Sequence, residues 1–147
     1  MILKNIDIQH IPVMVPEILK YLEVSSGGRY IDCTLGGGGH TKSLLEASNP
    51  GGEVLGIDAD HEAIEVSKNR LEEYGERFIY DNSNFKNIKK IAMKSKFVPC
   101  HGILFDLGVS SLQLDKESKE SRFWYLSYFI ILYSFLRVLA AALPTTP

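Results

Sequence analysis

The chain has 147 residues, the size of one domain, and its 16 Lys and Arg against 18 Asp and Glu give a net charge of -2. This balance excludes a globally basic nucleic-acid binder, and 23% charged with 45% hydrophobic residues exclude a disordered chain. Two cysteines exclude a disulfide-stapled scaffold, no spacing suits a zinc site, and no secretory signal is visible, so we expect a cytoplasmic protein without a metal.

The first part of the chain alternates helical and strand patterns, separated by turns rich in Gly, Ser and Pro. In chain order the sequence predicts a helix at 16–22, a strand at 29–35, a helix at 40–47, a strand at 53–57, a helix capped by Asp60 that reaches toward Tyr74, a strand at 77–80, a helix at 85–92 and a strand at 101–105. Strands that alternate with helices in this way predict a parallel sheet with helices on both faces.

Four glycines, Gly36 to Gly39, follow the first predicted strand. Glycine lets the backbone pass close to a ligand, and the next helix offers its N-terminal N–H groups to a carboxylate or phosphate. The run misses the dinucleotide fingerprint because Thr41 or Lys42 stands where the third glycine is required. A flexible surface loop is the alternative interpretation.

Asp58 ends the second predicted strand about twenty residues after the glycines, where an acid can accept hydrogen bonds from ribose hydroxyls. A surface carboxylate at a strand end is the simpler alternative. Together the glycines and Asp58 indicate a nucleoside with a negatively charged tail. NAD and S-adenosyl-L-methionine both qualify, and the imperfect fingerprint favours the second.

Asp106 follows the fourth predicted strand, beside a glycine and small hydroxyl residues. Such an acid can face a bound cofactor or an incoming amino group. An exocyclic amine is a poor nucleophile, so methyl transfer to it needs a hydrogen-bond acceptor and close in-line placement. A loop of turn-forming residues is the alternative.

Five motifs occur in a fixed order: His10–Met14, Asp32–Thr41, Gly56–Asp60, Ser83–Phe85 and Phe105–Asp115. They strongly resemble the bacterial RsmH/MraW family, S-adenosyl-L-methionine-dependent methyltransferases that act on cytidine N4 in small-subunit (16S) ribosomal RNA. The resemblance covers about residues 9–115. It implies a class I, Rossmann-like methyltransferase fold, of which 1–115 would form the N-terminal half with about four parallel strands.

The resemblance also implies a set of cofactor contacts. Gly38, Gly39 and His40 would hold the methionine end, and Asp58 would hold the ribose. Phe85, Asp106 and Gln113 would lie around the adenine and the sulfonium side. Phe85 also begins the apolar stripe of its own helix, so a core position is the alternative. The partner would be ribosomal RNA within the small ribosomal subunit, and no catalytic residue is assigned.

Residues 116–147 depart from the family pattern. From Phe123 to Leu143 only Arg137 is charged. The family's glycine is missing after Arg122 and an aromatic run begins there, which is what a reading-frame shift would produce. A membrane helix over 123–143 is the alternative. Without later strands, one edge of the fourth strand would be unpaired and prone to aggregation. The apolar tail would either partly cover this edge or increase the tendency to aggregate. We therefore expect a truncated chain that binds the cofactor weakly and transfers little methyl.

Two other functions stay open at this point: a nicotinamide-dependent oxidoreductase fragment, and a non-catalytic, membrane-associated product.

Five lysines within residues 86–96 also admit two interpretations. A solvated helix face is the simpler one. Contact with RNA phosphates, which would make binding salt-dependent, is the other.

Overall fold

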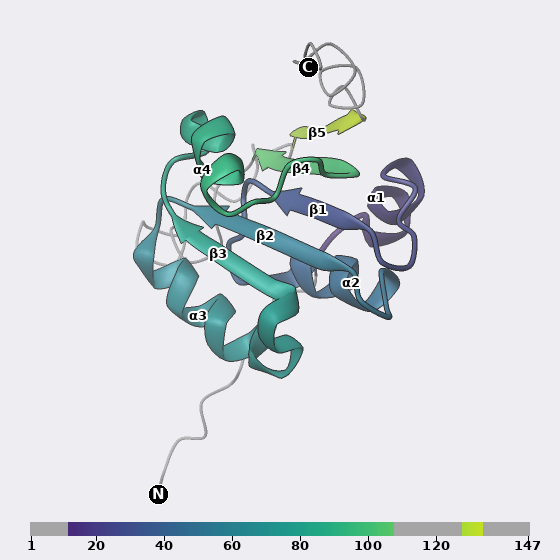
Figure 1. Cartoon of the computed structure of the whole chain (residues 1–147), viewed down its shortest axis with the longest axis horizontal. Helices are drawn as coiled ribbons and strands as arrows, with labels where there is room; N and C mark the ends of the chain where they lie inside the picture. Colours follow the sequence, from purple (N-terminus) through teal and green to yellow (C-terminus); the bar gives the residue numbers. More distant parts are fainter. Residues whose placement is uncertain (1–11, 108–127, 134–147) are drawn as a thin grey trace, which may run out of the picture.

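The structure, a computed structural model, describes residues 12–107 and 128–133 (Figure 1). Its elements in chain order are α1 Val15–Tyr21, β1 Arg29–Asp32, α2 Gly39–Ala47, β2 Glu53–Asp58, α3 His61–Leu71, the 3-10 helix η1 Glu72–Arg77, β3 Phe78–Asn82, the 3-10 helix η2 Phe85–Asn87, α4 Ile88–Lys94, β4 Gly102–Leu107 and β5 Tyr128–Tyr133.

The described strands form one sheet in the order β3-β2-β1-β4-β5. Strands β1 to β4 pair in parallel, with β1 in the middle, where Ile31 lies between Leu55 of β2 and Ile103 of β4. This arrangement confirms the expected Rossmann-like parallel sheet. Because parallel strands point the same way, the residues that follow β1, β2 and β4 gather at one edge.

Alternate residues along the strands enter two separate hydrophobic cores, as the strand period of two requires. Tyr30 and Val54 join the core that includes residues from α1, α2 and α3. Ile31 and Leu55 join the core that includes Ile91 and its neighbours from α4. Three helices therefore cover one face of the sheet and α4 covers the other, which confirms the predicted helices on both faces (Figure 1).

Two helices differ from their predicted bounds for local reasons. Asp60 caps α3 as predicted, because its Oδ1 accepts the Glu62 N–H at 2.9 Å. The α-helix nevertheless ends at Leu71, short of Tyr74, and η1 follows, interrupted by Gly75 at a φ of 53°. The helix predicted from residue 85 begins as the 3-10 turn η2 and becomes α-helical only at Ile88.

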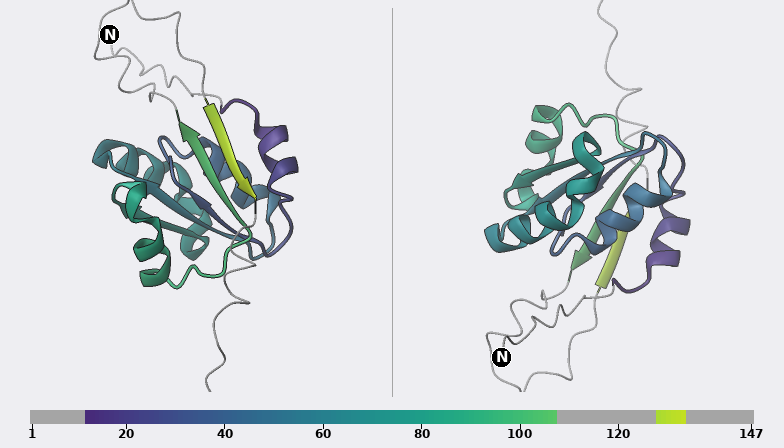
Figure 2. Two further views of the ribbon diagram at one scale, coloured as in Figure 1. Left: turned by 90° about the horizontal axis from the view of Figure 1, so that it is seen from above. Right: turned by 90° about the horizontal axis from the view of Figure 1, so that it is seen from below.

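The apolar tail contributes β5, which pairs antiparallel with β4 and places Ile131 opposite Leu104. Figure 2 shows the two strands side by side. The outer edge of β4 is therefore covered, the first of the two outcomes that the sequence left open. One continuous membrane helix over 123–143 is wrong, because residues 128–133 are a strand. In the described ranges no helix has the length and apolarity to cross a bilayer.

The core packing predicts a large cost for Leu44→Ala. Leu44 of α2 is 0% exposed in the core beneath α1, α2 and α3, so the truncation leaves a cavity and lowers the free energy of unfolding by about 2–5 kcal/mol. Val66→Ala on the exposed side of α3 is the control, with an expected change within about 0.5 kcal/mol. Urea denaturation measures both values, and equal changes would contradict this core assignment.

Candidate functional site

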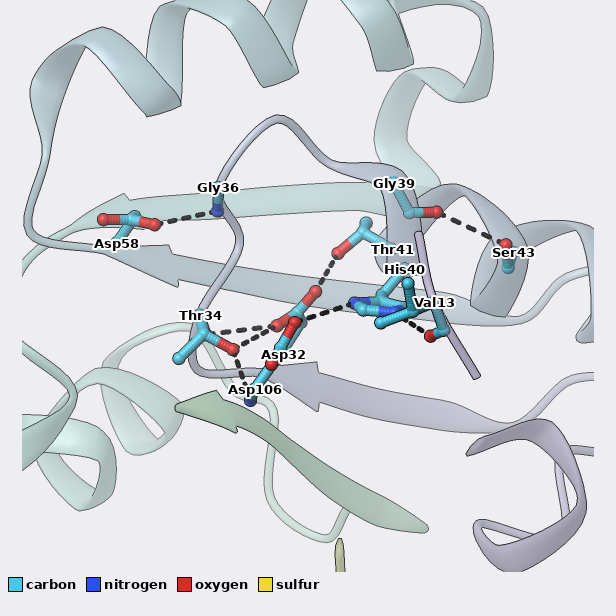
Figure 3. Close-up of polar contacts among 10 residues, drawn as sticks. All are labelled: Val13, Asp32, Thr34, Gly36, Gly39, His40, Thr41, Ser43, Asp58 and Asp106. Atoms are coloured by element: carbon cyan, nitrogen blue, oxygen red, sulfur yellow. Dashed lines mark hydrogen bonds and ion pairs between the residues drawn. The ribbon is translucent and has the colours of Figure 1, made fainter. Parts of the chain in front are cut away.

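Three carboxylates lie at the carboxyl ends of neighbouring strands: Asp32 ends β1, Asp58 ends β2, and Asp106 lies near the end of β4. Figure 3 shows them around the loop that joins β1 to α2, which contains the four glycines. The structure thus brings Asp58 and Asp106 to the same edge as the glycine loop, as the sequence predicted. Asp32 is an addition to the predicted set.

The Asp58 carboxylate holds the start of the glycine loop. Its Oδ2 accepts the Gly36 N–H at 2.8 Å and its Oδ1 accepts the Asp60 N–H at 2.9 Å. Gly36 has a φ of +50°, a left-handed conformation that side chains other than glycine rarely adopt. A carboxylate has about four acceptor positions, so Asp58 keeps acceptor capacity beyond these two bonds.

The middle of the loop is held by α3. Gly38 has a φ of +76°, and a Cβ at this position would come within 3.0 Å of Leu71 and 3.2 Å of Ser67. Arg70 donates from Nη1 to the Gly37 carbonyl at 3.2 Å. Gly38 is therefore required both by its backbone conformation and by its close approach to α3, and the loop is packed rather than loose.

Asp32 is buried, with 1% of its surface exposed. The Thr41 hydroxyl donates to its Oδ2 at 2.8 Å and the Thr34 N–H donates to its Oδ1 at 3.1 Å. Burial raises the pKa of Asp32 above the ordinary value, and the bonds from Thr41 and Thr34 and the proximity of His40 offset part of that rise. Thr41, which stands where a dinucleotide fingerprint needs glycine, thus has its own role as the donor to Asp32.

Asp106 is linked to the same cluster through Thr34, whose hydroxyl accepts the Asp106 N–H at 2.7 Å. The Asp106 Oδ2 lies 3.7 Å from Nδ1 of His40, whose Nε2 lies 2.9 Å from the Val13 carbonyl oxygen. The other carboxylate oxygen, Oδ1, is buried and has no hydrogen-bond partner among the described residues. An unsatisfied buried carboxylate oxygen is costly, so this atom points to a ligand donor or positive charge.

Phe85 lies in η2 and packs edge-on against Phe105 of β4, with ring centroids 5.6 Å apart. Its side chain is 39% exposed, so Phe85 is not the core residue that the alternative interpretation of its helix would make it. Phe105 packs against the core on the α4 face of the sheet, so Phe85 lies on that face, near the carboxyl end of β4. Gln113, the remaining predicted contact, lies outside the described residues.

The sequence predicted five residues that the structure brings to one edge: Gly38, Gly39, His40, Asp58 and Asp106. It missed Asp32, Thr41 and Arg70. The signal for Asp32 was present, because Asp32 lies four residues before the first glycine of the run and ends a strand whose neighbours also end in acids. Nothing in the sequence distinguishes Arg70 from the other basic residues of an exposed helix.

The buried carboxylate predicts a pH dependence of stability. Because folding raises the pKa of Asp32, the folded chain binds this proton more tightly than the unfolded chain does above pH 3.8. The free energy of unfolding therefore falls as pH rises from 3.8 to the raised pKa, and Asp32→Asn removes this contribution. Urea denaturation from acid to neutral pH should show the variant gaining relative to the parent chain as pH rises.

Thr41→Val is the matched variant for this measurement. It removes the hydroxyl that lowers the Asp32 pKa, so the decline should extend to higher pH than in the parent chain. Superimposable pH profiles for the parent chain and Asp32→Asn would contradict the assignment.

Known proteins similar to this chain give a consistent result. Residues 7–125 match the profile of the MraW methylase family. The chain is 49% identical over 118 residues to the ribosomal RNA small subunit methyltransferase H of Dehalococcoides mccartyi, covering 80% of this chain and 34% of that protein. The protein of the same name from Thermomicrobium roseum is 48% identical over 114 residues, covering 78% and 35%.

Among solved structures, a SAM-dependent O-methyltransferase from Thermotoga maritima is similar with 24% sequence identity and a TM-score of 0.46, over 50% of this chain and 28% of that one. The chain spans about a third of the length of the curated relatives it matches. The profile match covers most of the sequence, including every residue of the strand-end cluster. The chain belongs to the MraW methylase family.

Proposed function

We propose that this chain forms the cofactor-binding part of an S-adenosyl-L-methionine-dependent methyltransferase that modifies the N4 amino group of a cytidine in small-subunit ribosomal RNA. The family and the names of its relatives support methyl transfer to ribosomal RNA. The resemblance of the sequence motifs supports the N4 position and the small ribosomal subunit as the partner. The observation that carries the proposal is the cluster of three carboxylates around the glycine loop, at one edge of the sheet.

The charge of this cluster fits the predicted cofactor. S-Adenosyl-L-methionine has a ribose diol, a sulfonium, an ammonium and one carboxylate, so it carries a net positive charge. Asp58 and Asp106 suit those positive groups and the ribose hydroxyls, and Asp32 lies buried behind them, bound to Thr34 and Thr41. A dinucleotide would instead bring a negatively charged pyrophosphate toward the same carboxylates, which weighs against the nicotinamide alternative.

Each part of the cofactor has a matching group in the chain. Asp58, already bound to the Gly36 N–H, has acceptor capacity left for the ribose hydroxyls. The first turn of α2, at Gly39 and His40, begins where backbone N–H groups favour a carboxylate. The Asp106 Oδ1 has no partner among the described residues and can face the sulfonium side. The half-exposed ring of Phe85 offers a surface for adenine.

The chemistry follows from these positions. When bound, S-adenosyl-L-methionine supplies an electrophilic methyl group at the place where the amine must arrive. The chain's part is to hold that group still and to orient the amine, because in-line placement supplies much of the rate. Asp106 is the residue whose Oδ1, without a partner among residues 12–107 and 128–133, can accept a hydrogen bond from an incoming amino group.

Binding of the cofactor tests the proposal directly. Isothermal titration should detect binding of S-adenosyl-L-methionine to the chain, and NAD should bind much more weakly. Asp58→Ala should lower the affinity for S-adenosyl-L-methionine by about 10- to 100-fold, because it removes the acceptor for the ribose and leaves the Gly36 N–H without its carboxylate partner. Asp60→Asn is the control with unchanged affinity, because asparagine caps a helix as well as aspartate does. Equal binding of the two ligands, or an unaltered Asp58→Ala variant, would contradict the proposal.

The low turnover expected from the sequence remains a prediction. We expect the 147-residue chain to transfer tritiated methyl to small ribosomal subunits at least about a hundredfold more slowly than the Dehalococcoides mccartyi relative, of which the matched segment covers 34%. The physical reason is that the rate of methyl transfer depends steeply on the position of the amine, so a small misplacement of the amine lowers the rate by about this factor. Equal rates for the two proteins would overturn this expectation and leave the cofactor site in place.

A further inference from the structure

The lysine cluster that follows β3 stands out against the acidic charge of the chain. Five of the 16 Lys and Arg residues lie within residues 86–96, whereas none of the 18 acidic residues lies between Asn82 and Phe105. All five lysines are exposed. A segment with this charge in a chain of net charge -2 forms a local positive surface.

Packing directs these lysines outward. Ile91 and Ala92 of α4 are each 4% exposed and enter the core on their face of the sheet. Because α4 is anchored by that side, Lys89 and Lys90 are left on the solvent side of the helix. Figure 1 shows α4 on the face of the sheet opposite to α1, α2 and α3.

The described carboxylates do not neutralise this surface. Lys94 lies 3.6 Å from an Asp81 oxygen, but within residues 12–107 no carboxylate comes within ion-pair distance of Lys86, Lys89 or Lys90. Lysines on the other face differ, since Lys68 lies 2.9 Å from Glu65. The lysine face, defined as Lys86, Lys89 and Lys90, therefore has its positive charge available to a partner.

The lysine face borders a shallow, wide-open hollow. An open hollow of about 480 Å³ is lined by the three lysines together with Asn87 and Met93. Met93 is 62% exposed, so it offers apolar and polarisable contact next to the ammonium groups. Cations around an amide and an apolar side chain suit a phosphate group attached to a sugar and base.

The lysine face also leads to the strand-end cluster. Phe85 immediately precedes Lys86 in η2 and packs against Phe105, which precedes Asp106. A polyanion that lies along η2 and α4 would thus reach the carboxyl end of β4 from the α4 face of the sheet. The lysine face shares no residue with the strand-end cluster.

We propose that the lysine face binds the phosphodiester backbone of the RNA substrate and guides a nucleotide toward the strand-end cluster. This inference rests on the proposed function, because it assumes that RNA is the substrate. The opposite charges of the lysines and the phosphates provide the attraction, and the hollow beside Met93 accommodates part of a sugar or base.

The test compares two triple variants of the full chain. Lys86→Gln, Lys89→Gln and Lys90→Gln together remove the lysine face, and Lys20→Gln, Lys42→Gln and Lys68→Gln remove the same charge from α1, α2 and α3. Fluorescence anisotropy with a labelled RNA hairpin that has unpaired cytidines measures the affinity over about 50–200 mM salt. Isothermal titration with S-adenosyl-L-methionine provides the second measurement.

We expect the lysine-face variant to bind the hairpin at least about tenfold more weakly in low salt, with a slope of log affinity against log salt smaller by about 2–3. The control triple variant should match the parent chain, and both variants should keep their affinity for S-adenosyl-L-methionine. Unchanged hairpin binding by the lysine-face variant would overturn the inference. The inference would also be overturned if the lysine-face variant kept its affinity for the hairpin but lost binding to phosphatidylserine vesicles, because the lysines would then recognise a membrane surface.

The two proposals fail in distinguishable ways. A parent chain that binds S-adenosyl-L-methionine but shows no lysine-dependent RNA binding overturns the lysine face alone. A parent chain that shows no affinity for S-adenosyl-L-methionine contradicts the proposed cofactor site, whatever the hairpin measurement gives.

Discussion

The hydrogen bond from the Gly36 N–H to the Asp58 carboxylate is the contact on which the site depends. It joins the loop after β1 to the end of β2, and Thr34 extends the connection to Asp32 and Asp106. The ends of three strands are in this way fixed to one another. A glycine loop that was free to move would not present a constant set of donors and acceptors to a ligand.

Charge separates the molecule into two neighbouring regions. Three carboxylates gather at the strand ends, and the lysine face follows Phe85, whose ring packs against Phe105 near the carboxyl end of β4. A cationic methyl donor suits the first region, and an anionic nucleic acid suits the second. The near-zero net charge of the chain conceals this division, because the two regions almost cancel in the total.

The sequence was sufficient for the parallel sheet, because alternation of strands and helices leaves few other arrangements. It was less successful at the ends of elements. Gly75 interrupts the 3-10 helix η1, which follows α3. The spacing of apolar residues does not show that α3 itself ends at Leu71. For 128–133, a continuous apolar run fits a helix and a strand equally well, and only pairing with β4 distinguishes them.

The candidate site shows the same limit. Asp58 and the glycines could be predicted because their roles depend on position along the chain. The role of Asp32 depends on burial and on two donors, Thr34 and Thr41, that fold back onto it. That the Asp106 Oδ1 has no hydrogen-bond partner among the described residues likewise depends on its three-dimensional surroundings. Such features follow from packing, which a sequence pattern does not specify.

The most direct measurement is a titration of the isotopically labelled chain with S-adenosyl-L-methionine, followed by amide ¹H–¹⁵N shifts. We expect the largest changes on Gly36 to Thr41, Asp58 and Asp106, with small changes along α1. Changes centred on α1 or β3, or no saturable change at all, would contradict a cofactor site built around the Asp58–Gly36 contact.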